Sequence, residues 1–312
     1  MPRTLLPPKL RRGATIGIVA PASPPRIARH LEDGIELLKS RGYQIRRGAS
    51  LDQRDGYLSG SDETRAADIN AMFADASVDA IICSRGGYGS GRILSRIDYE
   101  GIRKHPKIFV GYSDITALMM AIQRATGMIT FAGPMVAPDF GQGMDAFSDE
   151  ALFAMITRIR ARRRLPIVPG EIHALRPGNA VGRLLGGNMA VLVTLLGTPH
   201  EPEWNGSILF LEDVGENIYK IDRMFSHLKN AGVLTRISGL LLGSFTSIPA
   251  DAPNRELHDV VSEYSLPLDI PVLSGIPFGH QARKLTLPMG ATIGMNAARK
   301  TVTVLEPVLL PR

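Results

Sequence analysis

The chain lacks several features that would point to particular classes of protein. Among its 312 residues are one cysteine and one tryptophan, and no apolar run reaches the ~18–20 residues that a membrane span needs. A single cysteine, Cys83, excludes an internal disulfide and any metal cluster of cysteine ligands. Because Cys83 lies in the apolar run 80–83, we expect it to pack in a strand rather than react. The N-terminus carries basic residues but neither an apolar core segment nor a cleavage site, so we expect a cytoplasmic protein with no membrane partner.

The positive charge of the chain is concentrated in one place. The formal net charge is +6, and five arginines within seven positions account for most of it: Arg158, Arg160, Arg162, Arg163 and Arg164. A basic run that ends a helix just before Leu165-Pro166 would compensate the helix dipole and stay solvated. An anionic partner is the alternative. A single local cluster does not predict a nucleic-acid partner.

The first half of the sequence alternates apolar runs with amphipathic segments. Strand-like runs occur at 15–20, 43–45, 80–83, 108–110 and 128–131, and helical patterns occupy 26–41, 62–76, 90–97 and 114–126. Continuous β-rich runs separated by helices favour an α/β fold with a doubly wound parallel sheet, buried on both faces. Ligands of such sheets bind beyond the carboxyl ends of the strands.

A chain of this length exceeds what one core usually supports, so we expect two domains. The pattern breaks down from about 136 to 175, where Pro, Gly and Arg gather. We therefore predict an N-terminal domain at 1–145, a link at 146–175 and a smaller C-terminal α/β domain at 176–312. The later part shows strands at 207–211, 239–243 and 271–274, helices at 188–196, 217–231 and 253–265, and a terminal antiparallel pair within 286–308. A fragment spanning 1–150 should then fold by itself.

A glycine-rich turn, 86–91, follows the third strand. It begins like a phosphate-binding loop, but Arg92 and Ile93 stand where that motif needs Lys and Ser or Thr. The dinucleotide motif fails as well, because Arg92 replaces its last glycine. Two interpretations remain: a flexible strand-to-helix turn, or a turn whose bare N–H groups approach an oxyanion. In the second case Arg85, Gly86 and Tyr88 are the residues we expect to bind substrate.

Ser113 lies in Gly111-Tyr112-Ser113-Asp114-Ile115, between an apolar strand and an apolar helix. A serine at a sharp strand-to-helix turn presents its hydroxyl above the sheet, where a nucleophile belongs. An ordinary helix N-cap explains the same residues, and the second glycine of the usual nucleophile motif is missing. The pentapeptide alone leaves both interpretations open.

Two further side chains lie at predicted strand ends in the second half. Glu212 ends the strand that begins near 207, and His280 closes a loop after the strand at 271–274. A serine, a histidine that takes its proton and an acid that orients the imidazole form a catalytic triad. The N–H groups of Asp114 and Gly87 would hold the oxyanion. No spacing of His, Asp or Glu predicts a metal site, so we expect neither a metal nor a cofactor.

Six ordered motifs, spread over essentially the whole chain, resemble one family. They are 17–24, 84–90, 111–114, 186–188, 211–216 and Gly279-His280, and they resemble the LD-carboxypeptidases of the muramoyl-tetrapeptide type, the S66 serine peptidases. The resemblance implies that Ser113 is the nucleophile, Glu212 orients the base and His280 is the base. It also implies a triad assembled across two domains, a homodimer, and removal of D-alanine from a cytoplasmic peptidoglycan tetrapeptide during wall recycling.

Two alternatives to the recycling function remain at this stage. A sister branch with the same triad cleaves a microcin-type peptidyl nucleotide, and Trp204 could offer a base-stacking face to such a substrate. The short path from Gly197 to the strand at 207 leaves little room for an extended loop, which favours the muropeptide. A non-catalytic protein that binds an anionic ligand at the glycine-rich turn is the rival of a different class.

Overall fold

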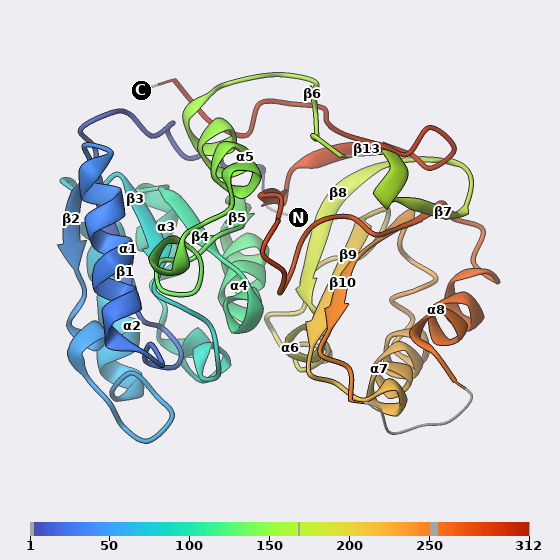
Figure 1. Ribbon diagram of the computed structural model, residues 1–312, viewed down its shortest axis with the longest axis horizontal. Helices are drawn as coiled ribbons and strands as arrows, with labels where there is room; N and C mark the ends of the chain where they lie inside the picture. Colours follow the sequence, from blue (N-terminus) through green and yellow to red (C-terminus); the bar gives the residue numbers. More distant parts are fainter. Residues whose placement is uncertain (1–2, 168, 250–254, 312) are drawn as a thin grey trace. The chain divides into compact units, whose positions relative to one another are not determined.

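The computed structural model describes residues 3–167, 169–249 and 255–311, and the chain divides into two compact units (Figure 1). The first unit comprises Met1–Ile159 together with two later segments, Ala282–Gly290 and Val308–Arg312. The second unit comprises Arg160–Gln281 and Ala291–Pro307. Each unit has its own sheet.

The first unit contains a six-stranded sheet in the order β12-β5-β4-β3-β1-β2. Its strands are β1 (Thr15–Val19), β2 (Gln44–Arg47), β3 (Ala80–Cys83), β4 (Ile108–Gly111), β5 (Thr130–Ala132) and β12 (Leu287–Met289). β1 to β5 pair in parallel, and only β12 runs antiparallel to its neighbour β5. The central strands β3 and β4 are buried along their whole length, which explains their uninterrupted apolar sequences.

The handedness of parallel crossovers decides which face of the first sheet each helix covers. α1 (Ala28–Ser40) connects β1 to β2 in one direction along the sheet, whereas α2 (Asp62–Ala74), α3 (Tyr99–Lys104) and α4 (Thr116–Thr126) accompany the steps in the other direction. Right-handed connections therefore place α1 on one face and the other three on the opposite face. The chain reverses direction between β1 and β3, and at such a point the loops beyond the strand ends diverge and leave room for a ligand. The doubly wound parallel sheet predicted from the sequence is confirmed.

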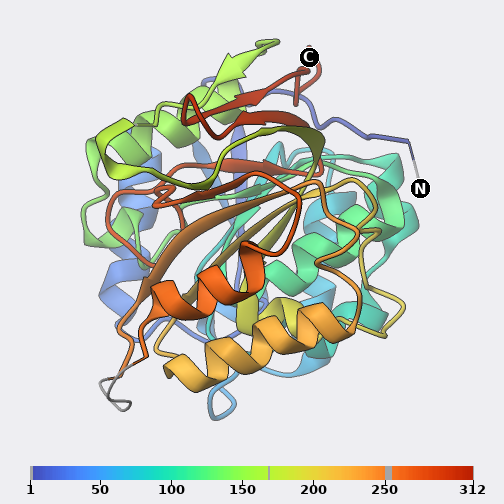
Figure 2. The ribbon, with the colours of Figure 1, turned by 90° about the vertical axis from the view of Figure 1, so that its right-hand side faces the viewer.

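The second unit contains an eight-stranded sheet in the order β6-β14-β13-β8-β9-β10-β11-β7. The strands are β6 (Arg163–Arg164), β7 (His173–Arg176), β8 (Asn179–Asn188), β9 (Ile208–Val214), β10 (Gly239–Thr246), β11 (Val272–Ser274), β13 (Thr292–Asn296) and β14 (Thr301–Val304). β8 to β11 are parallel, and the predicted terminal antiparallel pair is β13 with β14. The connecting helices are α6 (Met189–Val193), α7 (Ile218–Asn230) and α8 (Leu257–Ser265); α7 and α8 lie side by side on one face of the sheet (Figure 2).

The segment at 146–175, predicted as the link between the domains, contains regular secondary structure. It contains α5 (Ala146–Thr157), whose residues Leu152, Met155 and Ile156 are buried, and it continues through β6 to β7. The reason is that Asp145 caps α5 by accepting hydrogen bonds from two backbone N–H groups, a signal that the surrounding Pro and Gly obscured.

The arginine cluster does not close a helix as a unit, so that prediction is wrong. α5 ends at Thr157, and only Arg158 occupies its C-cap and forms an ion pair with Glu150 at 2.9 Å. Arg163 and Arg164 instead form the short edge strand β6. The predicted helix at 90–97 is a 3-10 helix, η2 (Ser90–Arg96). The expected start of α8 at 253 lies outside the described residues.

Candidate active site

Ser113 occupies a strained turn between β4 and α4. Its φ is +62°, a left-handed value that non-glycine residues rarely adopt and that is typical of functional positions. The N-cap of α4 is Ile115, which makes no side-chain capping bond, and Ser113 belongs to the 3-10 turn η3 (Ser113–Ile115). The N-cap interpretation of Ser113 is therefore wrong, and the hydroxyl is presented by a sharp strand-to-helix turn.

The glycine-rich turn that follows β3 comes directly against Ser113. A Cβ atom at Gly86 would lie 2.8 Å from the Cβ and 2.9 Å from the Oγ of Ser113, and 3.2 Å from the backbone nitrogen of Asp114. Such a contact is closer than any side chain allows, so only glycine permits this approach. The carboxylate of Asp114 accepts a hydrogen bond from the backbone N–H of Ser90 at 2.8 Å, which ties the two turns together.

Further hydrogen bonds hold the glycine-rich turn from its other side. The Ser23 hydroxyl accepts the backbone N–H of Tyr88 at 3.1 Å, and the Ser23 N–H donates to the carbonyl of Gly86 at 3.3 Å. The fully buried Arg65 donates to the carbonyls of Pro21 and Gly89 and pairs with Asp62. These contacts hold the loop after β1 and the loop after β3 together at the carboxyl edge of the first sheet.

The predicted substrate-binding side chains have distinct environments. Arg85 is half-buried and donates to the carbonyl of Pro24 at 3.0 Å. Burial, with the charge of Arg26 adding to it, lowers the pKa of Arg85. Tyr88 is 53% exposed, and its ring makes an edge contact with that of Tyr57, with 5.6 Å between the centroids.

Glu212 and His280 form a hydrogen-bonded pair in the second unit. Nδ1 of His280 lies 2.7 Å from Oε2 of Glu212, and Glu212, near the carboxyl end of β9, is only 2% exposed. A carboxylate on Nδ1 fixes the imidazole tautomer that presents a basic Nε2. The side chain of His280 keeps 20% of its surface exposed, so the ring is half-buried rather than enclosed.

His280 is held in place by Gly279, which belongs to its own sequence motif, and by two residues that were not candidates from sequence, Ser244 and Thr246. A Cβ atom at Gly279 would lie 2.6 Å from Oε2 of Glu212, so glycine is required for the histidine loop to approach the acid. The N–H and the hydroxyl of Ser244 both donate to the carbonyl of Phe278, at 3.1 and 3.0 Å. The Thr246 hydroxyl donates to the carbonyl of His280 at 3.2 Å. Ser244 and Thr246 could not be found from sequence because small polar residues near the end of a strand carry no distinctive pattern.

Asp213, the second acid at this strand end, has a structural environment. Its carboxylate accepts hydrogen bonds from Asn188 Nδ2 at 3.0 Å and from the N–H groups of Ala190 and Val214 at 2.8 Å each. Burial raises the pKa of Asp213 to about 6, against the lowering effect of these donors. Asp213 thus secures the turn from β8 into α6, while its neighbour Glu212 contacts the imidazole.

Two other sequence-based interpretations have clear outcomes. Trp204 is fully buried, and its Nε1 donates to Glu201 at 3.0 Å; it offers no exposed face for a base to stack on. Cys83 is buried in β3, as predicted, and burial raises the pKa of its thiol. Over residues 3–167, 169–249 and 255–311, no group of His, Cys, Asp or Glu side chains could hold a metal ion.

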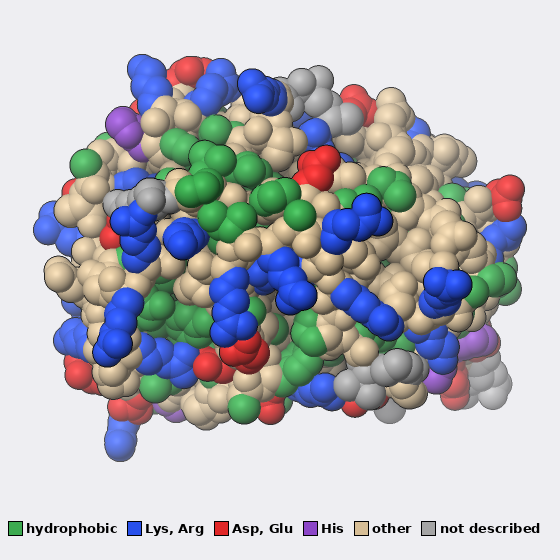
Figure 3. Space-filling model, turned by 90° about the horizontal axis from the view of Figure 1, so that it is seen from above, with side chains coloured by type: hydrophobic (Ala, Val, Ile, Leu, Met, Phe, Trp, Pro, Cys, Tyr) green, Lys and Arg blue, Asp and Glu red, His purple; other side chains and the backbone are tan. Residues whose placement is uncertain are grey.

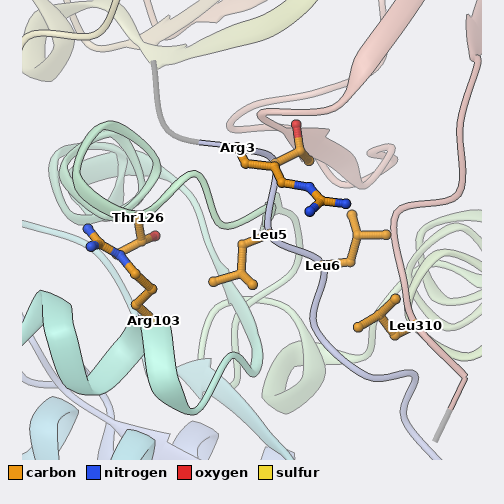
Figure 4. Close-up of a pocket in the computed structure, with 7 residues that line it drawn as sticks. Arg3, Leu5, Leu6, Arg103, Thr126 and Leu310 are labelled. Atoms are coloured by element: carbon orange, nitrogen blue, oxygen red, sulfur yellow. The ribbon is translucent and has the colours of Figure 1, made fainter.

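A cavity of about 570 Å³ lies elsewhere in the first unit (Figure 4). Its lining includes Arg3, Leu5, Leu6, Arg103 and Leu310, and none of the predicted site residues.

On the face of the molecule shown in Figure 3, Lys and Arg side chains lie in separate groups among hydrophobic and polar atoms. Within the described part of the chain, no helix is both long and apolar enough to span a bilayer.

A serine on a strained turn, a glycine turn packed against it and an acid–imidazole pair are together typical of serine hydrolases. Comparison with known proteins agrees. The LD-carboxypeptidase N-terminal domain matches residues 16–133, and the LD-carboxypeptidase C-terminal domain matches residues 181–295. The chain therefore belongs to the LD-carboxypeptidase family, the S66 peptidases, and it is a serine-type carboxypeptidase.

Similar proteins support this assignment over nearly the full length. The probable murein peptide carboxypeptidase of Bacillus subtilis (strain 168) is 40% identical over 304 residues, covering 96% of this chain and 93% of that protein. The apo structure of an inactive mutant of the microcin C7 self-immunity protein MccF has a TM-score of 0.93 at 28% identity, covering 98% of this chain and 100% of that one. The muramoyltetrapeptide carboxypeptidase of Oxalobacter formigenes has a TM-score of 0.85 at 30% identity, covering 96% and 100%.

Proposed function

We propose that the protein removes the terminal D-alanine from a murein tetrapeptide by acyl-enzyme chemistry, without a metal. Ser113 is the nucleophile, His280 the general base and Glu212 the residue that orients it. The observation that carries this proposal is the 2.7 Å contact between Glu212 and His280, because an oriented imidazole is what a serine needs to become reactive. The left-handed turn at Ser113 supplies the matching nucleophile.

The proposed reaction proceeds in two halves. Oγ of Ser113 attacks the carbonyl carbon that precedes D-alanine while Nε2 of His280 takes the hydroxyl proton. The tetrahedral oxyanion accepts hydrogen bonds from the N–H groups of Asp114 and Gly87. The imidazolium then gives its proton to the departing amine, and D-alanine leaves. Water, deprotonated by His280, hydrolyses the acyl ester and restores Ser113.

The muropeptide is the favoured substrate for a specific reason. Stacking on an aromatic side chain favours binding of a nucleotide base, and Trp204, the residue suggested for that contact from the sequence, is buried. The relative from Bacillus subtilis is named for a murein peptide and that from Oxalobacter formigenes for a muramoyltetrapeptide. The similarity to MccF makes a microcin-type peptidyl nucleotide the second candidate.

Mass spectrometry of the purified enzyme with synthetic tetrapeptides tests the proposal. The panel contains a peptide that ends in L-diaminopimelyl-D-alanine, the same peptide with L-lysine in the third position, and a peptidyl nucleotide. We expect loss of one alanine from a tetrapeptide, and no loss with Ser113→Ala. Cleavage of the peptidyl nucleotide alone would establish the second candidate instead. If a peptide binds but is not cleaved, and a fluorophosphonate does not label Ser113, the protein is a non-catalytic binding protein.

A metal-independent mechanism predicts that chelators have no effect. EDTA should leave alanine release unchanged, because a base and an oxyanion hole perform the steps that a metal would otherwise assist. Treated and untreated enzyme are compared before and after addition of Zn²⁺. Loss of activity in EDTA and its recovery with Zn²⁺ would contradict this mechanism.

We further propose that the reaction serves wall recycling in the cytoplasm and that the protein forms a homodimer, as the family resemblance implies. Cell fractionation tests the first statement, since recycled tetrapeptides must meet the enzyme in the cytoplasm. Analytical ultracentrifugation tests the second, with a sedimentation mass twice that of the chain as the expected result.

A further inference from the structure

A buried ion pair lies beside the residue that precedes the nucleophile. Lys284 is 4% exposed and Asp139 is 8% exposed, and Nζ of Lys284 lies 2.5 Å from Oδ1 of Asp139. The other carboxylate oxygen of Asp139 accepts the N–H of Met135 at 2.8 Å. Both charges are therefore compensated inside the first unit. A buried ion pair contributes little net stability compared with an apolar pair of the same volume. Stability alone therefore does not explain why Lys284 and Asp139 are buried here.

Lys284 makes a second polar contact, with Tyr112. Its Nζ donates to the Tyr112 hydroxyl at 3.1 Å and lies 4.4 Å from the centroid of the ring. Tyr112 immediately precedes Ser113, whose φ of +62° is costly to hold. A strained conformation persists only where its surroundings fix it. The ammonium group, itself immobilised by Asp139, restrains Tyr112 on the N-terminal side of the nucleophile.

The backbone of Lys284 is anchored at the same place. Its N–H donates to the Ser148 hydroxyl at 2.8 Å, and that hydroxyl donates to the carbonyl of Ala282 at 3.1 Å. β12 begins three residues later and joins the sheet beside β5. Lys284 is four residues after His280 in the sequence. The backbone of Lys284 therefore anchors, within the first unit, the chain that follows His280 in the sequence.

We propose that Lys284, held by Asp139, is a positioning residue for catalysis. It restrains Tyr112, and through it the strained backbone of Ser113, and it also secures the segment that leads from His280. The side chain of this residue thus constrains the nucleophile, and its backbone N–H anchors the connection to the base. This inference rests on the proposed function, because it assigns a role relative to the proposed triad.

The test compares three variants by their kinetics. Tyr112→Phe removes the hydroxyl that accepts from Lys284 and keeps the ring. Lys284→Met removes the charge and its contacts with Asp139 and Tyr112, and the double variant combines the two changes. For Lys284→Met we expect kcat for alanine release to fall by about 10-fold to 10²-fold, the cost of a small misplacement of reacting groups, with KM changed less than about twofold. Tyr112→Phe should show a smaller loss of the same kind, and the double variant should match Lys284→Met because Lys284→Met already removes the ammonium group that contacts Tyr112.

Lys107 provides a matched control in the same unit. It is likewise buried, at 7% exposure, and its Nζ donates to backbone carbonyls of Met72 and Asp75 at the end of α2. Lys107→Met should lower the melting temperature without lowering kcat or the rate at which a fluorophosphonate labels Ser113. A general loss of stability and a loss of positioning are thereby separated.

The outcomes are distinct. Slower labelling and lower kcat in the Tyr112 and Lys284 variants, with Lys107→Met unaffected, support the inference. Wild-type kcat and labelling in folded Lys284→Met overturn it, and if that variant does not fold, unchanged kinetics of Tyr112→Phe overturn it. Labelling reports on Ser113 without any peptide. If the wild-type enzyme is labelled but releases no alanine, the proposed function fails while the labelling comparison still decides this inference; if the wild type is not labelled, both fail.

Discussion

At position 86 the absence of a Cβ atom decides where Ser113 can lie. The Cβ of an alanine there would meet both side-chain atoms of the serine below 3.0 Å, and the rigid turn could relieve the contact only by moving the nucleophile. Gly91 lies in the same turn and has open space around it. Gly86 therefore permits a close approach to Ser113, whereas Gly91 makes no such approach.

Replacement of these glycines gives a paired prediction. Gly86→Ala should lower kcat by about 10²-fold, since misplacement of a reacting group by about 1 Å costs that much. Gly91→Ala should retain activity within about twofold. Alanine release by both purified variants is the measurement. Equal activity of the two variants would show that the approach to Ser113 is not needed.

Substitutions in the proposed triad should lower turnover strongly while leaving the fold intact. Ser113→Ala and His280→Ala should lower kcat by roughly 10³-fold to 10⁶-fold, and Glu212→Gln by less, because the acid only orients the base. Double variants should be little worse than single ones, since the three residues act as a unit. Circular dichroism checks that each variant is folded. Near-normal turnover by Ser113→Ala would remove the serine from the mechanism.

At the level of secondary-structure elements, the carboxyl ends of β8 and β9 form one connected support. Asn188 pairs with Glu212 in the parallel register, and the Asn188 side chain caps α6 while donating to Asp213. Strand ends of a parallel sheet lie along the same edge, so two neighbouring acids can take different roles there. Glu212 faces the imidazole, and Asp213 binds backbone.

The raised pKa of Asp213 predicts a pH-dependent stability. Its pKa is about 6 in the folded protein and about 3.9 in an unfolded chain, so the folded state binds the proton more tightly. Stability from this group is present at low pH and is lost as pH rises from about 4 to about 6, by about 3 kcal/mol. The difference in unfolding free energy between wild type and Asp213→Asn should change over that range and be constant above about pH 7. Parallel profiles from urea titrations would contradict the prediction.

At the scale of the whole molecule, the chain crosses between the two units more than once. Residues 282–290 leave the second unit, add β12 to the first sheet and return. A fragment cut near the middle of the sequence therefore lacks one strand of its own sheet. It also leaves the buried Asp139 without Lys284, and an unpaired buried charge is strongly destabilising. The expectation that 1–150 folds by itself changes accordingly.

The corrected prediction concerns two fragments. Residues 1–159 alone should be poorly folded, whereas 1–159 with residues 282–290 attached through a flexible linker should show a cooperative thermal transition. Neither should be labelled by a fluorophosphonate at the full-length rate, because Glu212 and His280 are absent from both. Labelling of either fragment at that rate would mean that Ser113 finds its base within its own unit, at His30 or His105, and the proposed triad would have to be abandoned.

The sequence by itself was sufficient for the features that depend on local pattern. Continuous apolar runs separated by helical periodicity predicted the doubly wound sheet, because a strand buried on both faces must be apolar throughout. Most predicted strands and helices agree with the observed ones, from β1 to α7. Ser113, Glu212 and His280 could be selected since each follows or ends such a strand, and motif order then indicated the family.

Only the tertiary structure decided what depends on distant contacts. Lys284 and Asp139 are 145 positions apart, and Ser23 and Tyr88 are 65 apart, so no periodicity links them. The positive φ of Ser113 is likewise imposed by packing, since the local sequence is equally compatible with a helix cap. The segment 282–290 is flanked by parts of the second unit, yet its strand β12 pairs with β5 in the first sheet. A strand this short does not specify its partner locally, so the folding of the whole chain decides which sheet edge it joins.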